Sequence, residues 1–278
     1  MSGEYQSTGN PSERGTPVSE ELYRLPLYYD VAFSWDIGPE IEWFGNLFRE
    51  HVPFPVENVL EPACGAGRFL VELPKHGYRV TGYDSSEDML EYARGRVDSA
   101  GVTDSVALAK AEMQSARFPR EFDAALNSIN SLGYLLEDAD IVSHFRLTGE
   151  ALKPGGIYIV HISTAWDDTA EMSHSTWEME RDGVRVKTRW EGEREDRETR
   201  RSHQLCTMEI DDHGEKRVLV DRHELRLWLL DEFKEQIERC GTLVLEAIYN
   251  DGREHERLPL DSHISGEMGN HYYILKAR

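Results

Sequence analysis

The run from Val59 to Leu70 constrains the fold of this chain more than any other stretch. Apolar residues lead to Glu61, two glycines follow one residue apart at Gly65 and Gly67, and an apolar-periodic helix begins directly after them. The pattern predicts a strand, a tight turn and a helix whose free N–H groups face a ligand. Glycines suit such a turn because they carry no Cβ to keep the ligand away from the backbone. The run therefore predicts a site for a nucleoside-type cofactor.

A second acidic residue follows at the spacing of a nucleoside site. Residues 78–84 have the pattern of a strand that ends at Asp84, 17 residues after Gly67. An acid near this spacing binds the two ribose hydroxyls of a nucleotide. We therefore expect Asp84 to bind the ribose.

Two classes of cofactor compete for the glycine turn. A dinucleotide site favours a third glycine, because the pyrophosphate sits on the helix N-terminus, but Leu70 stands at that position. Glu61 would repel a diphosphate, whereas its carboxylate suits a cation such as the sulfonium and ammonium of S-adenosylmethionine. An ordinary strand-to-helix turn is the third interpretation, because two glycines alone specify little.

Length and composition limit the number of domains, the class of binding partner and the cellular location that we expect. A length of 278 residues allows one large domain or one domain with an insertion. A net charge of −21 argues against nucleic-acid binding, which needs Lys and Arg, and favours a small or cationic substrate. A high-salt habitat or simple solubility explains the acidity equally well. No apolar run is long enough to span a bilayer and no signal-peptide core is present, so we expect a cytoplasmic protein without a membrane partner.

The three cysteines argue against a stabilising framework. Cys64, Cys206 and Cys240 are widely spaced and form no C-x-x-C pair. Their odd number and spacing fit neither a set of disulfides nor a zinc site, and we expect no metal. Cys64, inside the glycine turn, is interpreted as a small packing residue.

Strand and helix patterns alternate from residue 57 onward. This alternation predicts an α/β fold with a doubly wound, mostly parallel sheet covered on both faces. Pro74 falls late in the first helix and should kink it or end it early. The predicted strands are 57–62, 78–83, 106–110, 122–129 and 156–162, and the predicted helices are 39–48, 66–76, 86–100, 112–116 and 138–152.

The pattern changes after residue 170. A hairpin over 175–190 turns at Asp182-Gly183, and a second over 202–228 turns at Asp212-His213-Gly214, which together predict an antiparallel insertion. A helix follows from Leu230, with Asp231 as its N-cap. Strands 243–249 and 271–276 end the sheet. The expected organisation is a disordered leader over 1–18, an N-terminal helical arm or lid over 19–56, a cofactor-binding core over 57–170, the insertion over 171–229 and the C-terminal part of the core over 230–278.

Residues 28–278 resemble the class I S-adenosylmethionine-dependent methyltransferases. Glu61–Gly67 resembles their first motif, Gly82-Tyr-Asp-Ser-Ser86 resembles their second, and Leu152–Gly156 matches their loop before the fifth strand. Phe122–Leu135 resembles the fourth-strand motif of the glycine and amino-sugar N-methyltransferases, without the proline of enzymes that methylate nucleic-acid amines. The resemblance implies a seven-stranded Rossmann-like sheet and S-adenosylmethionine as cofactor, with S-adenosylhomocysteine as product. It also implies a small-molecule acceptor, with N-methylation favoured over O-methylation.

The resemblance also gives cofactor roles to residues by position. Tyr29 looks like an N-terminal tyrosine that folds over the cofactor, although packing of the arm explains it equally well. The other implied roles are the methionine end for Glu61, Ala63, Gly65 and Gly67, the ribose for Asp84, the adenosine for Ser85, the adenine for Glu112 and Met113, and the methionine ammonium for the backbone oxygen of Asn127.

Ligands bind at the carboxyl edge of such sheets, and this edge holds the candidates for catalysis. An amine acceptor must be neutral, whereas an oxygen acceptor benefits from a general base. If a base is needed, His161 is the first candidate, and the alternative is a hydrogen-bonded histidine at a strand end. The insertion would cover the substrate or form a homodimer contact. The candidate catalytic residues are His161, Asn130, Tyr134 and Tyr28, and Trp177, Trp190 and Trp228 would line the insertion or form its own core.

Two functions of other classes remain open from the sequence. A non-catalytic S-adenosylmethionine-binding regulator would keep the same motifs without the chemistry. A nicotinamide-dependent oxidoreductase would need the phosphate-binding turn that Glu61 and Leu70 argue against.

Overall fold

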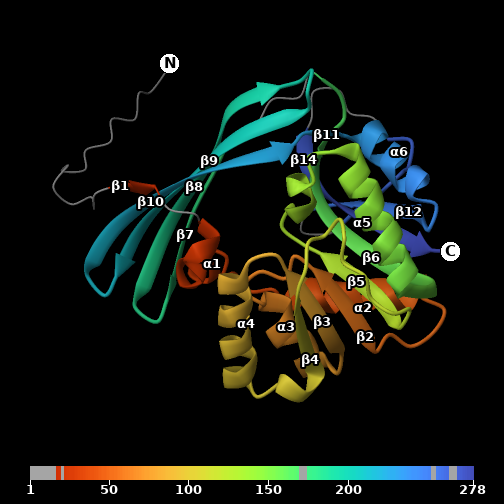
Figure 1. Ribbon diagram of the computed structural model, residues 1–278, viewed down its shortest axis with the longest axis horizontal. Helices are drawn as coiled ribbons and strands as arrows, with labels where there is room; N and C mark the ends of the chain where they lie inside the picture. The colour runs from red at the N-terminus through yellow and green to blue at the C-terminus, as the bar shows by residue number, and fades with distance from the viewer. Residues whose placement is uncertain (1–16, 20–21, 169–173, 252–254, 263–267) are drawn as a thin grey trace.

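The computed structural model describes residues 17–19, 22–168, 174–251, 255–262 and 268–278, and its strands form two sheets (Figure 1). Residues 1–16 of the predicted leader and residues 169–173, where the predicted core meets the predicted insertion, lie outside the described residues. Pro17–Ser19, which the sequence assigns to the leader and the arm, forms strand β1 and pairs in parallel with β10 (Glu215–Arg226).

The main sheet is the predicted doubly wound, mostly parallel sheet. Its strand order is β13-β12-β14-β6-β5-β2-β3-β4, and the last strand of the chain, β14, runs antiparallel to both of its neighbours. Seven strands carry the sheet; the short strand β13 adds to one edge, and the short strand β11 pairs with the end of β6. The strands are β2 (Asn58–Pro62), β3 (Arg79–Asp84), β4 (Val106–Lys110), β5 (Phe122–Asn127), β6 (Leu152–Ala165), β11 (Trp228–Leu229), β12 (Leu243–Asn250), β13 (Arg257–Leu258) and β14 (Met268–Ala277).

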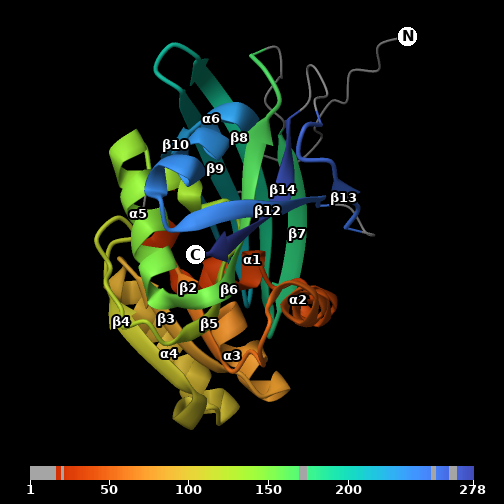
Figure 2. The same cartoon turned by 90° about the vertical axis from the view of Figure 1, so that its right-hand side faces the viewer.

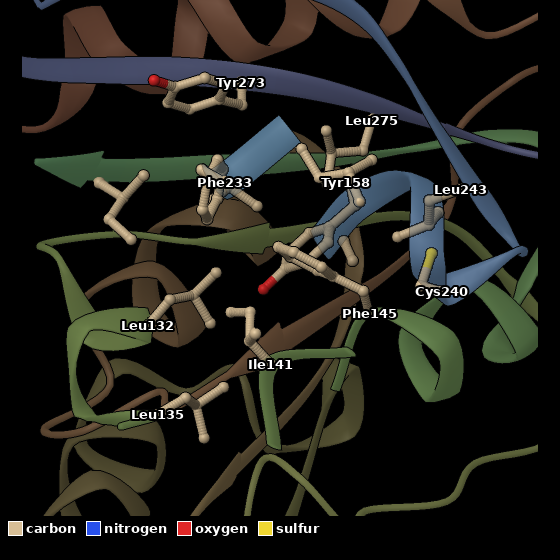
Figure 3. Packing of buried hydrophobic residues seen from close by; sticks show 14 of the residues in the cluster. Leu132, Leu135, Ile141, Phe145, Tyr158, Phe233, Cys240, Leu243, Tyr273 and Leu275 are labelled. Carbon is tan, nitrogen blue, oxygen red and sulfur yellow. The ribbon is translucent and has the colours of Figure 1, made fainter. Parts of the chain in front are cut away.

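Helices cover both faces of this sheet (Figure 2). Successive strand residues point to opposite faces, so Val59 packs with one layer of helices and Leu60 with the other. Phe145 and Phe233 fill the second layer around Tyr158, as Figure 3 shows. The first layer is α2 (Gly38–His51), α3 (Arg68–Glu72) and α4 (Glu87–Ala100), and the second is α5 (Asp138–Ala151) and α6 (Leu230–Cys240).

The insertion forms a separate antiparallel sheet that extends away from the core (Figure 1). Both predicted hairpins are present, and their turns have positive φ at both central residues, Asp182-Gly183 and His213-Gly214. Such turns match the twist of the flanking strands. The charged stretch after Trp190 continues one of these strands before the chain turns. The strands are β7 (Ser175–Arg181), β8 (Val184–Asp196), β9 (Arg201–Asp212) and β10.

The N-terminal arm joins the two sheets. Helix α1 (Pro26–Ala32) packs its apolar side against Val186 and Met208 of the insertion. Asp30, buried on α1, accepts a hydrogen bond from the Tyr92 hydroxyl at 2.9 Å on α4 and forms ion pairs with Arg96 of α4 and Arg181 of β7. A buried carboxylate on one element with partners on two others fixes the relative position of all three.

Four local predictions were wrong. The segment 112–116 forms a single turn rather than a helix, because the N–H groups of Ser115 and Ala116 both donate to the Glu112 carbonyl and no further turn follows. Asp231 lies in the first turn of α6 and does not cap it, because the chain enters the helix directly from β11 at Leu229. The strand predicted over 156–162 is twice as long, and the one over 122–129 ends at Asn127.

Pro74 acts as predicted. Helix α3 ends at Glu72, and a 3-10 turn over Leu73–His76 follows it. Proline has no N–H to continue the α-helical hydrogen bonds, so the helix stops one turn early.

Gly82 allows the first and second motifs to pack against each other. A Cβ at this residue would lie 2.7 Å from Leu70 Cδ2 and 2.9 Å from Cys64 Sγ, both in the buried core. We expect Gly82→Ala to lower the free energy of unfolding by about 1–3 kcal/mol, measured by urea denaturation, because overpacking forces these side chains apart. The double variant Gly82→Ala, Leu70→Ala should lose less than the sum of the two single variants. Strict additivity would contradict the clash.

Candidate functional site

A cavity of about 670 Å³ opens at the carboxyl ends of β2, β3 and β4, between the core, the arm and the insertion. Ligands of doubly wound sheets bind at this edge. Nine of the fourteen predicted site residues line the cavity: Tyr29, Ala63, Gly65, Asp84, Ser85, Glu112, Met113, Asn130 and Tyr134.

The two glycines of the turn differ in their roles. A Cβ on Gly65, whose φ is +51°, would have only Tyr29 within 4 Å, on the cavity side. A Cβ on Gly67, whose φ is +77°, would lie 3.0 Å from Ala93 Cβ of α4, and this residue does not line the cavity. Gly65 therefore gives a ligand access to the backbone, whereas Gly67 permits the packing of two helices.

Asp84 lies at the end of β3 and holds the turn in place. Its carboxylate accepts hydrogen bonds from the N–H groups of Gly65 and Ser86, each at 2.9 Å. Burial raises the pKa of Asp84, and these two N–H groups oppose the shift. A carboxylate so oriented at the cavity wall still offers lone pairs to hydroxyl donors.

Glu61 is a buried carboxylate with an unsatisfied oxygen. Its Oε2 has no hydrogen-bond partner, and 3% of the residue is exposed. Burial raises the pKa of Glu61 well above its ordinary value, and the Arg68 guanidinium opposes this shift. An orphaned buried acceptor two residues from the cavity wall fits a cationic group of a ligand, which would supply the missing partner.

Tyr29 and Phe33 close the cavity from the arm. Their rings stack with centroids 4.5 Å apart, and both line the cavity beside Gly65. Burial raises the pKa of Tyr29 to about 12, so the phenol stays neutral. The two rings are positioned to exclude water from whatever Gly65 contacts.

Comparison with known proteins identifies the family. Residues 59–156 match the family model described as a methyltransferase domain. The chain is 26% identical over 184 residues to the putative methyltransferase YqeM of Bacillus subtilis (strain 168), an alignment that covers 66% of this chain and 72% of that protein. Residues 59–156 are therefore a methyltransferase domain of the S-adenosylmethionine-dependent kind.

Two further relatives extend the comparison. This methyltransferase is 30% identical over 135 residues to the dTDP-3-amino-3,4,6-trideoxy-alpha-D-glucopyranose N,N-dimethyltransferase of Streptomyces venezuelae, which covers 48% of this chain and 54% of that protein. The solved structure of Streptomyces venezuelae DesVI has the same fold, with a TM-score of 0.72, 23% identity and coverage of 91% of this chain and 96% of that chain.

The cofactor side of the cavity fits S-adenosylmethionine, the methyl donor of this family. The orphaned oxygen of Glu61 matches a cation, the carboxylate of Asp84 matches two hydroxyl donors, and Gly65 leaves the space between them open. Asn127 does not line the cavity. Its side-chain amide donates to the Pro62 carbonyl at 2.9 Å, and the predicted role of its backbone oxygen stays a prediction.

His161 lies outside the cavity, which argues against the predicted base. Its Nδ1 accepts a hydrogen bond from the Ile129 N–H at 3.3 Å, and its Nε2 lies 3.2 Å from Asp251 Oδ2. The ring also stacks on Tyr272, with centroids 4.4 Å apart. With both nitrogens engaged, His161 supports the turn at Ile129 rather than facing a substrate.

Tyr28 also lies outside the cavity. Its hydroxyl donates to Asp212 Oδ2 at 2.9 Å, and the Arg217 guanidinium lies over its ring. These contacts tie α1 to the hairpin of β9 and β10. Tyr28 is therefore a brace of the arm, and the structure gives it no access to an acceptor in the cavity.

The turn after β5 is strained where it meets the cavity. Ile129 and Asn130 both have φ near +55°, which is unusual for a β-branched residue. Asn130 Oδ1 accepts from the Ser163 N–H at 3.1 Å, and the Asn130 N–H donates to the His161 carbonyl. Strained backbone of this kind is concentrated at functional sites, and here it aims the turn into the cavity.

Several residues that line the cavity were not predicted as site residues from the sequence. Trp177 and Trp190 do line the cavity, whereas Trp228 is fully buried in the core cluster beside Phe233. Among the lining residues that were not predicted, six come from segments far apart in the chain and carry no local motif: Tyr23, Phe33, Ser163, Gln204, Met268 and Asn270.

Proposed function

We propose that this methyltransferase transfers a methyl group to the nitrogen of a small polar amine, with an amino sugar as the first acceptor class. The observation that carries the proposal is the charge of the cavity. Among the described residues that line it, Asp84, Glu112 and Asp140 are acidic, and none is Lys or Arg. An acidic cavity attracts an amine and disfavours a phosphate or a carboxylate.

The acceptor side of the cavity suits an amphipathic ring. The indoles of Trp177 and Trp190 supply apolar surface, and the amides of Gln204 and Asn270 supply hydrogen-bonding groups. Aromatic faces with a few polar groups are typical of sites for small polar rings. The amino-sugar relative from Streptomyces venezuelae supports the same class.

We also propose the cofactor contacts by residue. Glu61 would pair with the ammonium group, Asp84 with the ribose hydroxyls, and the segment of Glu112 and Met113 with the adenine. Ser85 would contact the adenosine from the end of the same strand as Asp84. The proposal for Asp84, Ser85, Glu112 and Met113 is supported by their position around one cavity. Glu61 does not line this cavity, and its support is the buried Oε2 that has no hydrogen-bond partner.

The reaction asks little of the protein beyond alignment. The cofactor supplies a methyl group already activated on a sulfonium. The residues of this chain would hold the acceptor nitrogen in line with that methyl group and keep water out, which can supply most of the rate. Asn130 and Tyr134 lie where an acceptor would meet the turn after β5, and Tyr29 and Phe33 cover the cofactor side.

A paired acceptor panel tests the proposal. The purified protein and S-adenosylmethionine would be incubated with D-glucosamine, 3-amino-3-deoxy-D-glucose, glycine, D-glucose and catechol, and products would be followed by mass spectrometry. We expect S-adenosylhomocysteine and an N-methylated product with an amino sugar and none with D-glucose. Methylation of catechol alone would favour an O-methyltransferase, and cofactor binding without turnover of any probe would favour a regulator.

We further propose that the insertion forms a homodimer contact. β7 is an edge strand of the insertion sheet, and among the described residues no strand pairs with its outer side, where a strand of another chain could add. Light scattering of the purified protein would give a dimer mass if the proposal holds. A monomer mass at concentrations up to about 100 times that of an activity assay would reject it.

A further inference from the structure

Three side chains from three elements form one hydrogen-bonded chain in the cavity wall. The Tyr23 hydroxyl, in the 3-10 turn Leu22–Arg24 of the arm, lies 2.6 Å from the Tyr134 hydroxyl, in the turn after β5. The Tyr134 hydroxyl lies 2.9 Å from His223 Nδ1 on β10. Both tyrosines line the cavity, and His223 lies behind them. These hydrogen bonds therefore lead from the cavity into the insertion.

His223, the last residue of this hydrogen-bonded series, lies beside a carboxylate that would stabilise a positive charge on its ring. His223 Nε2 lies 3.5 Å from Asp221 Oδ2 and has no hydrogen-bond partner. Asp221 is fixed by the Leu22 N–H, which donates to the same carboxylate at 2.6 Å. The Trp190 ring stacks on His223 with centroids 4.8 Å apart and shields it from water. An imidazolium formed here would face a carboxylate.

The surroundings of His223 favour a neutral resting state. Burial lowers the pKa of His223, and the Asp221 carboxylate opposes that shift. The groups around the ring are Tyr134 and Tyr23 from the core and the arm, Asp221 on its own strand, Gln204 opposite it on the neighbouring strand and Trp190 on the strand after that. A neutral ring that carries its hydrogen on Nε2 accepts a hydrogen bond at Nδ1 from the Tyr134 hydroxyl. The Tyr134 oxygen in turn accepts a hydrogen bond from the Tyr23 hydroxyl.

We propose that Tyr23, Tyr134 and His223 form a proton relay that carries the acceptor's proton out of the cavity. The inference rests on the proposed function, because it needs an acceptor that loses a proton. The acceptor nitrogen uses its lone pair to form the N–CH₃ bond while the S–CH₃ bond breaks and leaves its electron pair on sulfur. The methylated nitrogen gives its proton to Tyr23 Oη, Tyr23 gives its own to Tyr134, and Tyr134 gives its own to His223 Nδ1. The product amine and the thioether end neutral, and the positive charge rests on His223 beside Asp221.

The roles of the three residues differ. Tyr23 contacts the acceptor and is the catalytic residue of the relay, whereas Tyr134 and His223 act through it. General acid–base catalysis of this kind typically raises the rate of the chemical step by about 10²–10⁴-fold. The relay replaces His161, whose nitrogens are both engaged elsewhere.

The experiment compares Tyr134→Phe, His223→Gln and the matched control Tyr249→Phe. Tyr249 also bonds a buried histidine, with 3.3 Å from its hydroxyl to His51 Nε2, but it lies outside the cavity. With the amino sugar that the wild-type protein methylates, we expect the first two variants to lower kcat about 100-fold. The dissociation constant for S-adenosylhomocysteine should stay within threefold in all variants, and Tyr249→Phe should keep the wild-type kcat.

The pH profile separates a relay from a merely structural contact. In the wild type both the acceptor amine and His223 must be deprotonated, so log kcat should fall with a slope of 2 at low pH, whereas His223→Gln should fall with a slope of 1. NMR of the protein with ¹⁵N-labelled histidine needs no acceptor and should show His223 with its hydrogen on Nε2. A kcat within threefold of wild type in Tyr134→Phe, an unchanged slope in His223→Gln, or hydrogen on Nδ1 would overturn the relay. A wild type that methylates no probe would overturn the proposed function instead.

Discussion

Asp84→Ala is expected to raise the dissociation constant for S-adenosylmethionine about 100-fold. The carboxylate would lose two hydrogen bonds from ribose hydroxyls, and a hydrogen bond to a charged group contributes about 1.5–3 kcal/mol. The same loss is expected for S-adenosylhomocysteine, because the two molecules carry the same ribose. Isothermal titration calorimetry of the purified protein measures both constants.

A buried carboxylate at the opposite end of the strands is the matched control. Asp123 accepts from the N–H groups of Glu57 and Asn58 at 2.9 and 2.8 Å, as Asp84 does from its own turn, but does not line the cavity. Asp123→Ala should lower the free energy of unfolding and leave the cofactor affinity unchanged. Asp84→Asn preserves the shape of the turn and should weaken binding about tenfold. If Asp84→Ala binds within threefold of wild type, Asp84 is not the ribose ligand.

Glu61→Gln is expected to have opposite effects on binding and on stability. Loss of the carboxylate should raise the dissociation constant about 10–100-fold, because the ligand's cation loses a charged partner. The affinities for S-adenosylmethionine and S-adenosylhomocysteine should fall equally if Glu61 pairs with the ammonium, which both carry. A loss confined to S-adenosylmethionine would assign Glu61 to the sulfonium, and an unchanged affinity for both would remove it from the site.

The stability effect of Glu61→Gln depends on pH. Because burial holds the folded-state pKa of Glu61 above its ordinary value of 4.5, the carboxyl is protonated in both states below pH 4.5 and costs nothing there. As the pH rises above 4.5 the unfolded chain ionises first, and the free energy of unfolding falls until the folded carboxyl ionises too. The cofactor-free variant should therefore match the wild type near pH 4 and be about 1–3 kcal/mol more stable at pH 8. Urea denaturation at both values measures the difference.

Glu246 gives a control of the opposite sign. Burial raises its pKa, but the bonds to His51 and Lys276 outweigh burial and hold the pKa below its ordinary value. Its stabilisation is present above pH 4.5 and is lost as the pH falls through the folded-state pKa. Glu246→Gln should therefore lower stability at neutral pH and match the wild type in acid. A Glu61→Gln variant that behaved in the same way would show that Glu61 is paired rather than orphaned.

Local pattern was enough to predict most of the architecture. The strands from β2 to β6 and both hairpins follow from residue alternation and from turn residues such as Asp182-Gly183. The helix stop at Pro74 follows from the missing N–H of proline. The errors lie where long-range contacts override local preference, as at Leu229, where a strand leads directly into α6 and displaces Asp231 from the cap.

The site divides in the same way. The cofactor side could be predicted because Glu61, Gly65 and Asp84 lie in two short motifs whose spacing reflects a strand, a turn and a helix. The other side of the cavity could be predicted only in part. Tyr134 follows from its place after the fourth strand, but Tyr23 and His223 meet it only through the packing of the arm and the insertion over the core. His161 shows the converse: a histidine at the right strand end is turned away by its partners Ile129 and Asp251.

The sequence by itself determined the methyl donor, because the backbone geometry that admits it is encoded within about 25 consecutive residues, from Glu61 to Asp84. Only the tertiary structure decided which side chains complete the cavity, because its wall is assembled from segments up to about 250 residues apart. Local backbone conformation depends mainly on each residue and its neighbours in the sequence, so it can be predicted from the sequence. The direction in which a side chain points across a cavity depends on the packing of all the elements around it.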